Sequence, residues 1–180
     1  MNSKIYLSAG HWNGDSGATA NGYQENNLTK EFRDLVTYQL KSLFPDVAVI
    51  NDSDSESLAE YLKRINPNPE DVVVEVHFDS FGNDAKGSTA LIADKHTEES
   101  KRLAEELVNC TALMLKTDNR GVKTESDSHR GKLGFVRKGG KNVLMEIEFI
   151  SNKEYLDNYL SMKERLAILW AKILYDYSKI

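Results

Sequence analysis

The feature that most constrains the fold is the run Val72–Val76, in which four of five residues are valine. A strand with one solvent-facing side alternates polar and apolar residues, whereas a strand covered on both faces reads as a nearly continuous apolar run. Patterns of strand and helix alternate along the chain on both sides of this run. The sequence therefore predicts an α/β fold with Val72–Val76 as a central, buried strand.

The remaining expected elements share this alternation. Further strands are expected at residues 4–8, 47–50, 88–92, 133–137 and 143–149, helices at 26–44, 57–65 and 98–116, and two short helical stretches at the end of the chain. A length of 180 residues is that of one domain. We expect a single α/β domain over residues 1–180, with a twisted mixed sheet of about five or six strands and helices on both faces.

Composition excludes several classes of function. A formal net charge of −5 disfavours nucleic acid and anionic membrane as partners. The single cysteine, Cys110, permits neither an intrachain disulfide nor a cysteine-based metal site. No stretch approaches the roughly 18 apolar residues of a membrane span, and residues 1–3 before the first expected strand show no apolar signal core, so we expect no signal peptide. We expect synthesis in the cytosol, no membrane insertion, no nucleic-acid partner and, most simply, a monomer.

Three polar residues of ligand type lie at or near the ends of expected strands. His11 and His77 each follow an apolar run, and Glu146 lies within another. In an open α/β sheet, the ends of such strands line the crevice where ligands bind. Imidazole and carboxylate groups that converge there indicate a hydrolytic metal centre.

A catalytic zinc ion needs three protein ligands and an open position for water. Glu25 is the best candidate for the third ligand, because it closes the glycine-rich loop 10–22 and precedes the first helix, whose positive end favours an ionised carboxylate. From the residues alone, two other interpretations remain open: His11 as a hydrogen-bonded loop residue, and His77 as a core histidine with satisfied hydrogen bonds.

Six segments resemble, in order, the motifs of one enzyme family. They are residues 10–18, 22–28, 76–80, 120–123, 133–137 and 143–152. The segments resemble motifs of the zinc-dependent N-acetylmuramoyl-L-alanine amidases of the amidase_3 family. In the same order, the family motifs are Gly-His-Gly-Gly-x-Asp-Pro-Gly-Ala, Gly-x-x-Glu-x-x-Leu, Ile-His-x-Asn-Ala, Arg-Gly-Val-Lys, Leu-x-Val-Leu-Arg and Val-Leu-Val-Glu-x-Gly-Phe-Ile-Ser-Asn. The resemblance implies that His11, Glu25 and His77 bind Zn²⁺ and that Glu146 is the catalytic carboxylate.

The chain departs from the family pattern at four positions. Trp12 replaces a small residue, Ser16 replaces proline, Asp79 stands for asparagine, and Glu148 occupies a position usually held by glycine. In a strand, Glu146 and Glu148 share a face at a separation of about 7 Å, which predicts a raised pKa for one of them. The pair also allows a glycosidase acid and base, but that interpretation leaves both histidines unexplained.

The resemblance implies hydrolysis of the amide bond between N-acetylmuramic acid and L-alanine in bacterial peptidoglycan, the expected partner. With neither an export signal nor a wall-binding domain expected, a phage endolysin that reaches the wall through a holin or after lysis fits best. Two alternatives are a catalytically inactive protein that binds peptidoglycan fragments and a zinc carboxypeptidase. The sequence leaves open the roles of Glu148, His129 and Arg137, the last two as groove or surface residues.

Overall fold

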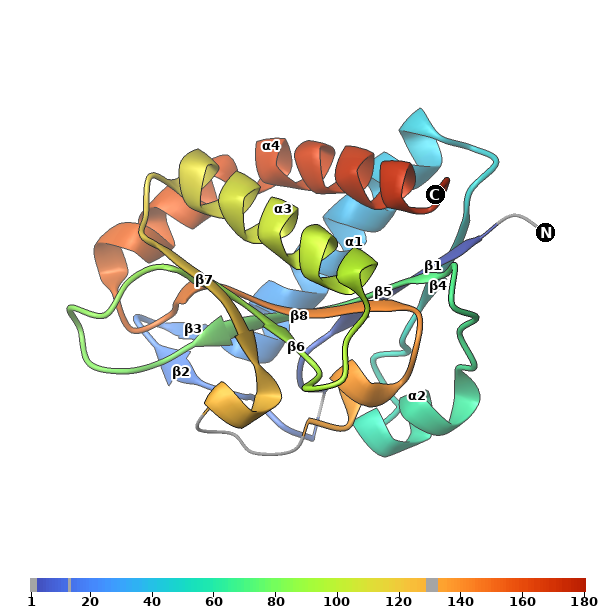
Figure 1. The fold of residues 1–180 in the computed structure, drawn as a ribbon. Helices are drawn as coiled ribbons and strands as arrows, with labels where there is room; N and C mark the ends of the chain where they lie inside the picture. The colour runs from blue at the N-terminus through green and yellow to red at the C-terminus, as the bar shows by residue number, and fades with distance from the viewer. Residues whose placement is uncertain (1–2, 13, 129–132) are drawn as a thin grey trace.

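The computed structural model describes residues 3–12, 14–128 and 133–180 (Figure 1). Among these residues, six strands form one sheet in the order β4-β1-β5-β8-β6-β7. Their bounds are β1 (Lys4–Ala9), β4 (Ala48–Asn51), β5 (Val72–Asp79), β6 (Ser88–Ile92), β7 (Asn119–Thr124) and β8 (Lys141–Phe149). β4, β1, β5 and β8 run parallel, while β6 is antiparallel to β8 and parallel to β7, so the sheet is mixed, as expected. A small separate hairpin joins β2 (Thr19–Ala20) to β3 (Tyr23–Gln24).

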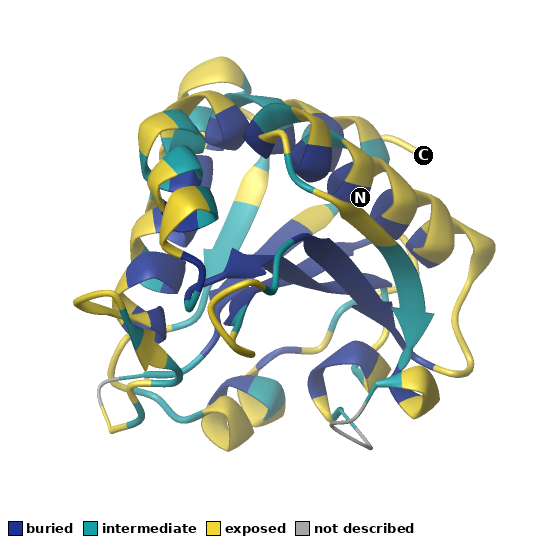
Figure 2. Ribbon diagram, turned by 90° about the vertical axis from the view of Figure 1, so that its left-hand side faces the viewer, coloured by how far each residue is buried: buried dark blue, intermediate teal, exposed yellow. Residues whose placement is uncertain are grey.

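Helices cover both faces of the sheet, but unequally (Figure 1). The longer helices of the described chain, α1 (Glu25–Leu43), α3 (Glu98–Leu115) and α4 (Lys153–Tyr177), lie on one face. Alternate residues of β5, including Val72, Val74 and Val76, pack with them in the larger apolar cluster. Figure 2 shows the strands buried between these helices and shorter helical segments below. The predicted α/β domain with helices on both faces is confirmed.

The opposite face of the sheet is covered by shorter helices. The short helix α2 (Leu58–Arg64) and the 3-10 helix η2 (Phe135–Arg137) pack against Tyr6, Val73 and Leu144 of three neighbouring strands. Because side chains on a strand alternate between faces, Ser8, Glu75, His77 and Glu146 lie on this same side of the sheet, nearer the strand ends. The polar residues of the sheet are therefore on the face that the long helices leave uncovered.

The predicted strand at 133–137 is wrong. Of this range, Phe135–Arg137 forms η2, whose Phe135 and Val136 are buried against the sheet. The strand position beside β6 belongs instead to β7, at residues where no strand was expected. β7 is an edge strand with exposed or half-buried residues, so its sequence lacks the apolar signal that marks the central strands.

The end of the chain is one helix of 25 residues, α4, instead of two short stretches. Ser161 lies inside this helix, where its hydroxyl donates a hydrogen bond to the Asn158 carbonyl. No described helix is both long enough and apolar enough to cross a bilayer.

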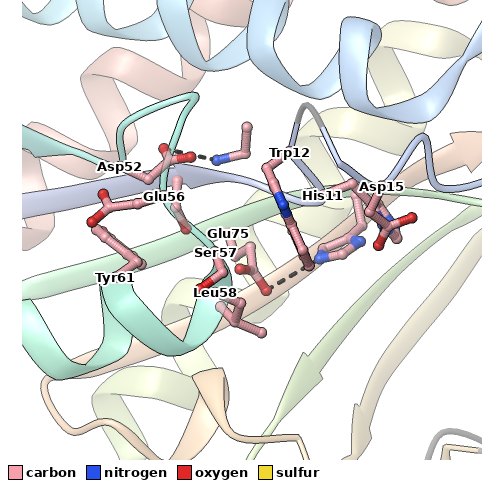
Figure 3. Close-up of a pocket in the computed structure, with 12 residues that line it drawn as sticks. His11, Trp12, Asp15, Asp52, Glu56, Ser57, Leu58, Tyr61 and Glu75 are labelled. Atoms are coloured by element: carbon pink, nitrogen blue, oxygen red, sulfur yellow. Dashed lines mark hydrogen bonds and ion pairs between the residues drawn. The ribbon is translucent and has the colours of Figure 1, made fainter.

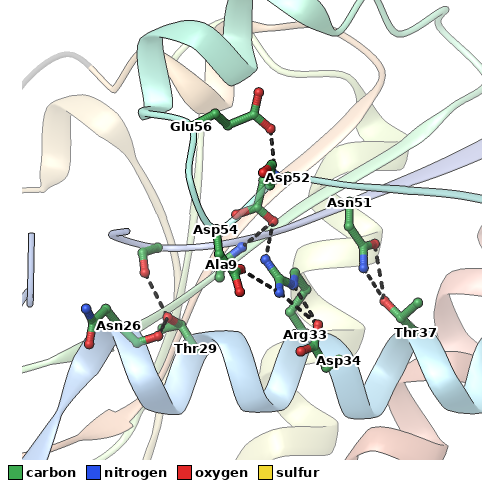
Figure 4. A network of polar contacts seen from close by, with 12 residues as sticks. Ala9, Asn26, Thr29, Arg33, Asp34, Thr37, Asn51, Asp52, Asp54 and Glu56 are labelled. Carbon is green, nitrogen blue, oxygen red and sulfur yellow. Dashed lines mark hydrogen bonds and ion pairs between the residues drawn. The ribbon is translucent and has the colours of Figure 1, made fainter. Parts of the chain in front are cut away.

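A buried ion-pair network holds the loop after β4 against α1 (Figure 4). Arg33 is 4% exposed, and its guanidinium lies 3.0 Å from Asp52 Oδ1 and 2.8 Å from Asp54 Oδ1. The same Asp52 oxygen accepts a hydrogen bond from the Ala9 amide at 3.1 Å. The network therefore fixes the end of β1, directly before the loop that carries His11.

Replacing Arg33 by methionine is expected to lower the free energy of unfolding by about 3–5 kcal/mol, because it leaves the Asp52 carboxylate buried without its cation. Urea unfolding followed by circular dichroism measures the change. Lys153→Met is the control, since its ion pair with Asp157 is exposed and contributes about 0–1 kcal/mol. Equal stabilities of the two variants would contradict the structural role of Arg33.

Candidate metal centre

Three side chains from separate elements meet at the ends of β1 and β5. His11 follows β1, Glu25 is the first residue of α1, and His77 lies near the end of β5. One ligand atom of each lies within 4.8 Å of the others. His11 Nε2 is 3.2 Å from Glu25 Oε2, and His77 Nδ1 is 3.1 Å from Glu25 Oε1. The convergence predicted from the sequence is thus present in the structure.

The backbone holds Glu25 in place. Its Oε2 accepts a hydrogen bond from the Ala18 amide, and its Oε1 accepts one from the Phe78 amide, both at 2.9 Å. The Glu25 amide in turn donates to the Ala18 carbonyl at 2.8 Å. A buried carboxylate with these fixed donors keeps one orientation, and this orientation faces both histidines.

Two glycines allow the close approach of the ligands. A Cβ at Gly10 would lie 2.4–2.6 Å from ring atoms of His77, and one at Gly17 would lie 2.6 Å from both Glu25 Oε2 and His11 Cδ2. Gly17 also has a φ of +62°, which L side chains rarely adopt. His11 itself has a φ of +66°, a conformation uncommon outside glycine. The loop backbone is thus shaped closely around the cluster.

Each histidine has a second carboxylate on its outer nitrogen. His11 Nδ1 lies 2.7 Å from Asp15 Oδ2, and His77 Nε2 lies 3.1 Å from Glu75 Oε2. The sequence analysis did not identify Glu75. The signal was present, because Glu75 is the one polar residue within the run Val72–Val76 and lies two residues before His77, on the same face of the strand.

The charges of the cluster shift the titration of its members. Burial favours the neutral form of Glu25, but hydrogen bonds with His11 and His77 outweigh it and lower the pKa of Glu25 well below its usual range. Burial likewise opposes protonation of His77, but Glu25 and Glu75 outweigh it and raise the pKa of His77 to about 10. The site is thus strongly cation-attracting.

Glu146 lies directly beside the cluster. In the pairing of β5 with β8, its register partner is His77, and across β6 its partner is Thr89. Its side chain is on the polar face of the sheet and is 3% exposed. The negative charge of Glu146 is among the causes that raise the pKa of His77. Glu146 therefore places a further carboxylate next to the three-residue cluster without being part of it.

Glu148 has a different role. Its Oε1 accepts hydrogen bonds from the amides of Gly87 at 2.7 Å and Phe149 at 2.9 Å, which fixes the start of β6. The pKa of Glu148 is raised, chiefly by its burial, instead of by the neighbouring Glu146 as the sequence suggested. Glu148 is structural in this fold.

Arg137 is also held in a structural contact. Its Nε donates to both oxygens of the buried Glu125 at 2.8 and 2.9 Å. Glu125 accepts further hydrogen bonds from the amides of Asp94 and Leu133, so the pair joins two loops. His129, for which a groove contact was an open possibility, lies outside the described residues.

Two hollows are lined by described residues of the site, one beside the cluster and one beside Glu146. One, of about 130 Å³, lies between the His11 loop and α2 and is lined by Trp12, Glu75 and Tyr61, among others (Figure 3). The second, of about 190 Å³, is lined by Glu146 and Lys123 together with Asp79, Thr89, Leu91, Arg120, Asp127 and Ser128. The first hollow therefore borders the cluster through His11 and His77, and the second borders Glu146.

Known proteins share both sequence and fold with this chain. A model of the Amidase_3 family, described as N-acetylmuramoyl-L-alanine amidase, matches residues 5–173. The uncharacterized protein YqiI of Bacillus subtilis (strain 168) is 32% identical over 155 residues, covering 85% of this chain and 73% of YqiI. The N-acetylmuramoyl-L-alanine amidase LytC of the same organism is 29% identical over 154 residues, and the match spans 82% of this chain but only 29% of LytC.

A solved structure from Neisseria meningitidis, described as a candidate N-acetylmuramoyl-L-alanine amidase, superposes with a TM-score of 0.79 at 26% identity. The superposition covers 97% of this chain and 95% of that one, so the whole fold is shared.

Proposed function

This chain belongs to the Amidase_3 family of N-acetylmuramoyl-L-alanine amidases, and on that premise we propose that it hydrolyses the amide bond between N-acetylmuramic acid and L-alanine in bacterial peptidoglycan. In this proposal His11, Glu25 and His77 hold a zinc ion, Glu146 is the catalytic carboxylate, and residues 1–180 form the catalytic domain. The observation that carries it is the convergence of three ligand atoms within 4.8 Å beside a fourth, carboxylate-bearing residue.

The donor set fits zinc. Two imidazole nitrogens and one carboxylate oxygen are ligands that zinc prefers, and three protein ligands are typical of a catalytic zinc site. The close approach at Gly10 and Gly17 leaves room for these side chains to face one another. When bound, such an ion supplies Lewis acidity, which polarises the carbonyl of the amide and lowers the pKa of water toward about 7.

The role proposed for Glu146 follows from its position. Its carboxylate accepts a proton from the attacking water as the water oxygen bonds to the carbonyl carbon. Glu146 then gives this proton to the nitrogen of L-alanine as the carbon–nitrogen bond breaks. The products are the lactyl carboxylate on the sugar and the free amine of the stem peptide. The hollow beside His11 and His77 and the hollow beside Glu146 offer space for parts of the substrate.

A role in cell-wall lysis, such as that of a phage endolysin, is also part of this proposal. Cleavage at this bond detaches the cross-linking peptides from the glycan strands, so the reaction itself weakens the wall. Loss of turbidity of a suspension of purified bacterial walls tests this part. Release of peptides without loss of turbidity would separate the reaction from lysis.

Digestion of purified peptidoglycan, followed by mass spectrometry, tests the proposed reaction. We expect intact stem peptides that begin with a free L-alanine amine, together with glycan strands without peptides. A zinc carboxypeptidase would instead release single amino acids and leave shortened peptides on the sugar. A catalytically inactive protein would bind the material and release nothing.

A further inference from the structure

We infer that Glu75 is a positioning residue of the metal centre, whose buried carboxylate orients the imidazole of His77. The inference rests on the metal site of the proposed function, and it assigns a role to a residue outside the ligand set and outside the catalytic carboxylate. Glu75 Oε2 lies 3.1 Å from His77 Nε2, while His77 Nδ1 lies 3.1 Å from Glu25 Oε1. The two nitrogens of one ring thus face two different carboxylates.

Each ring nitrogen of His77 contacts a different carboxylate, and this arrangement determines which nitrogen can bind a cation. Glu25 also contacts His11 Nε2, so His77 Nδ1 is the atom that faces the other ligand atoms. A neutral imidazole has one N–H donor and one acceptor, and a metal needs the unprotonated nitrogen. Once a metal displaces the second proton, donation of the remaining N–H from Nε2 to Glu75 would leave Nδ1 as the electron-pair donor that faces the cluster.

The surroundings of Glu75 give this hydrogen bond its importance. The Glu75 side chain is 4% exposed and lies in a strand whose neighbouring residues are valines. A buried carboxylate is costly unless it is hydrogen-bonded. Among the described residues, its side-chain hydrogen bond is the one to His77. The His77 ring also lies against Gly10. Because glycine has no Cβ, the imidazole can pack directly against the backbone at this position.

His11 provides a comparison within the same site. Its outer nitrogen, Nδ1, contacts Asp15, whose side chain is 43% exposed and lies in the same loop. Both histidines therefore have an outer carboxylate, but only that of His77 is buried in the sheet. Partners of this kind fix the orientation of a metal-binding histidine and increase its basicity, and their loss commonly weakens metal binding by about 10–100-fold.

The test is the zinc affinity of Glu75→Leu and Glu75→Gln, measured by competition with a chromophoric chelator. Leucine has a similar size and suits the apolar strand, so it removes the acceptor without leaving a cavity. We expect Glu75→Leu to weaken zinc binding by about 10–100-fold. Glu75→Gln retains an oxygen that can accept from Nε2, so we expect an intermediate affinity. The absorption spectrum of the cobalt-substituted protein should shift in Glu75→Leu, because the ring is no longer held.

Glu148→Gln is the matched control, since Glu148 is also a buried carboxylate of a sheet strand but accepts hydrogen bonds from the backbone amides of Gly87 and Phe149. Its zinc affinity should equal that of the wild type. Equal affinities of Glu75→Leu and the wild type would overturn the role of Glu75 and leave the proposed metal site intact. A wild-type protein that binds no zinc would overturn the metal site itself.

Discussion

Replacing Glu146 by glutamine is expected to reduce the rate of amide hydrolysis by about 10²–10⁴-fold, the usual contribution of a general base, while the zinc content stays unchanged. Glutamine has nearly the same size but cannot accept the proton of the attacking water at neutral pH. Zinc should remain because Glu146 is the strand neighbour of His77 and not one of the three clustered ligands. Release of stem peptides from peptidoglycan and elemental analysis measure the two quantities.

Glu148→Gln is the control for this experiment as well. It makes the same chemical change two residues along the same strand, and the amide oxygen can still accept the hydrogen bonds from Gly87 and Phe149. This variant should keep most of its activity. A Glu146→Gln enzyme with nearly wild-type activity would end the assignment of Glu146 as the base.

Replacing His77 by alanine should remove the metal itself, and with it the activity, a loss at least as large as that of Glu146→Gln. The substitution deletes one of three ligand atoms and leaves Glu25 and Glu75 without the imidazole between them. Elemental analysis of the purified variant should find no zinc. This loss of metal distinguishes the ligand variant from the Glu146 variant, which retains it.

His96→Ala is the matched control for the ligand variant. His96 is exposed, its ring nitrogen Nδ1 is hydrogen-bonded to the Ala93 carbonyl, and it is not part of the three-residue cluster. The variant should bind zinc and hydrolyse peptidoglycan like the wild type. If His77→Ala retained a full complement of zinc, His77 would not be a ligand.

Central parts of the fold could be predicted from the sequence because their physical signals are local. The valine run at Val72–Val76 marked β5, which lies between β1 and β8, and the apolar stripes marked the helices α1 and α3. The convergence of His11, Glu25 and His77 was predicted as well, and their ligand atoms lie within 4.8 Å of one another. Their role as zinc ligands stays a prediction that the experiments above address.

The parts that were missed depend on tertiary contacts. β7 is an edge strand, so its residues lack the apolar pattern, while the apolar residues of η2 cover the sheet without forming a strand. Glu148 stands where the family pattern has glycine. Its hydrogen bonds with the amides of Gly87 and Phe149 could not be predicted from the spacing of residues in the sequence. Glu75 was missed although it is the one polar residue of the run Val72–Val76, because its contact with His77 Nε2 depends on the orientation of the imidazole, which the sequence does not specify.

The most direct test of the account is to measure the zinc content and the hydrolytic activity of one purified preparation before and after chelation. We expect about one zinc ion per chain, because three ligands converge, together with loss of stem-peptide release after chelation and its recovery when zinc is added back. A preparation free of metal by elemental analysis that still cleaves peptidoglycan at the original rate would contradict it.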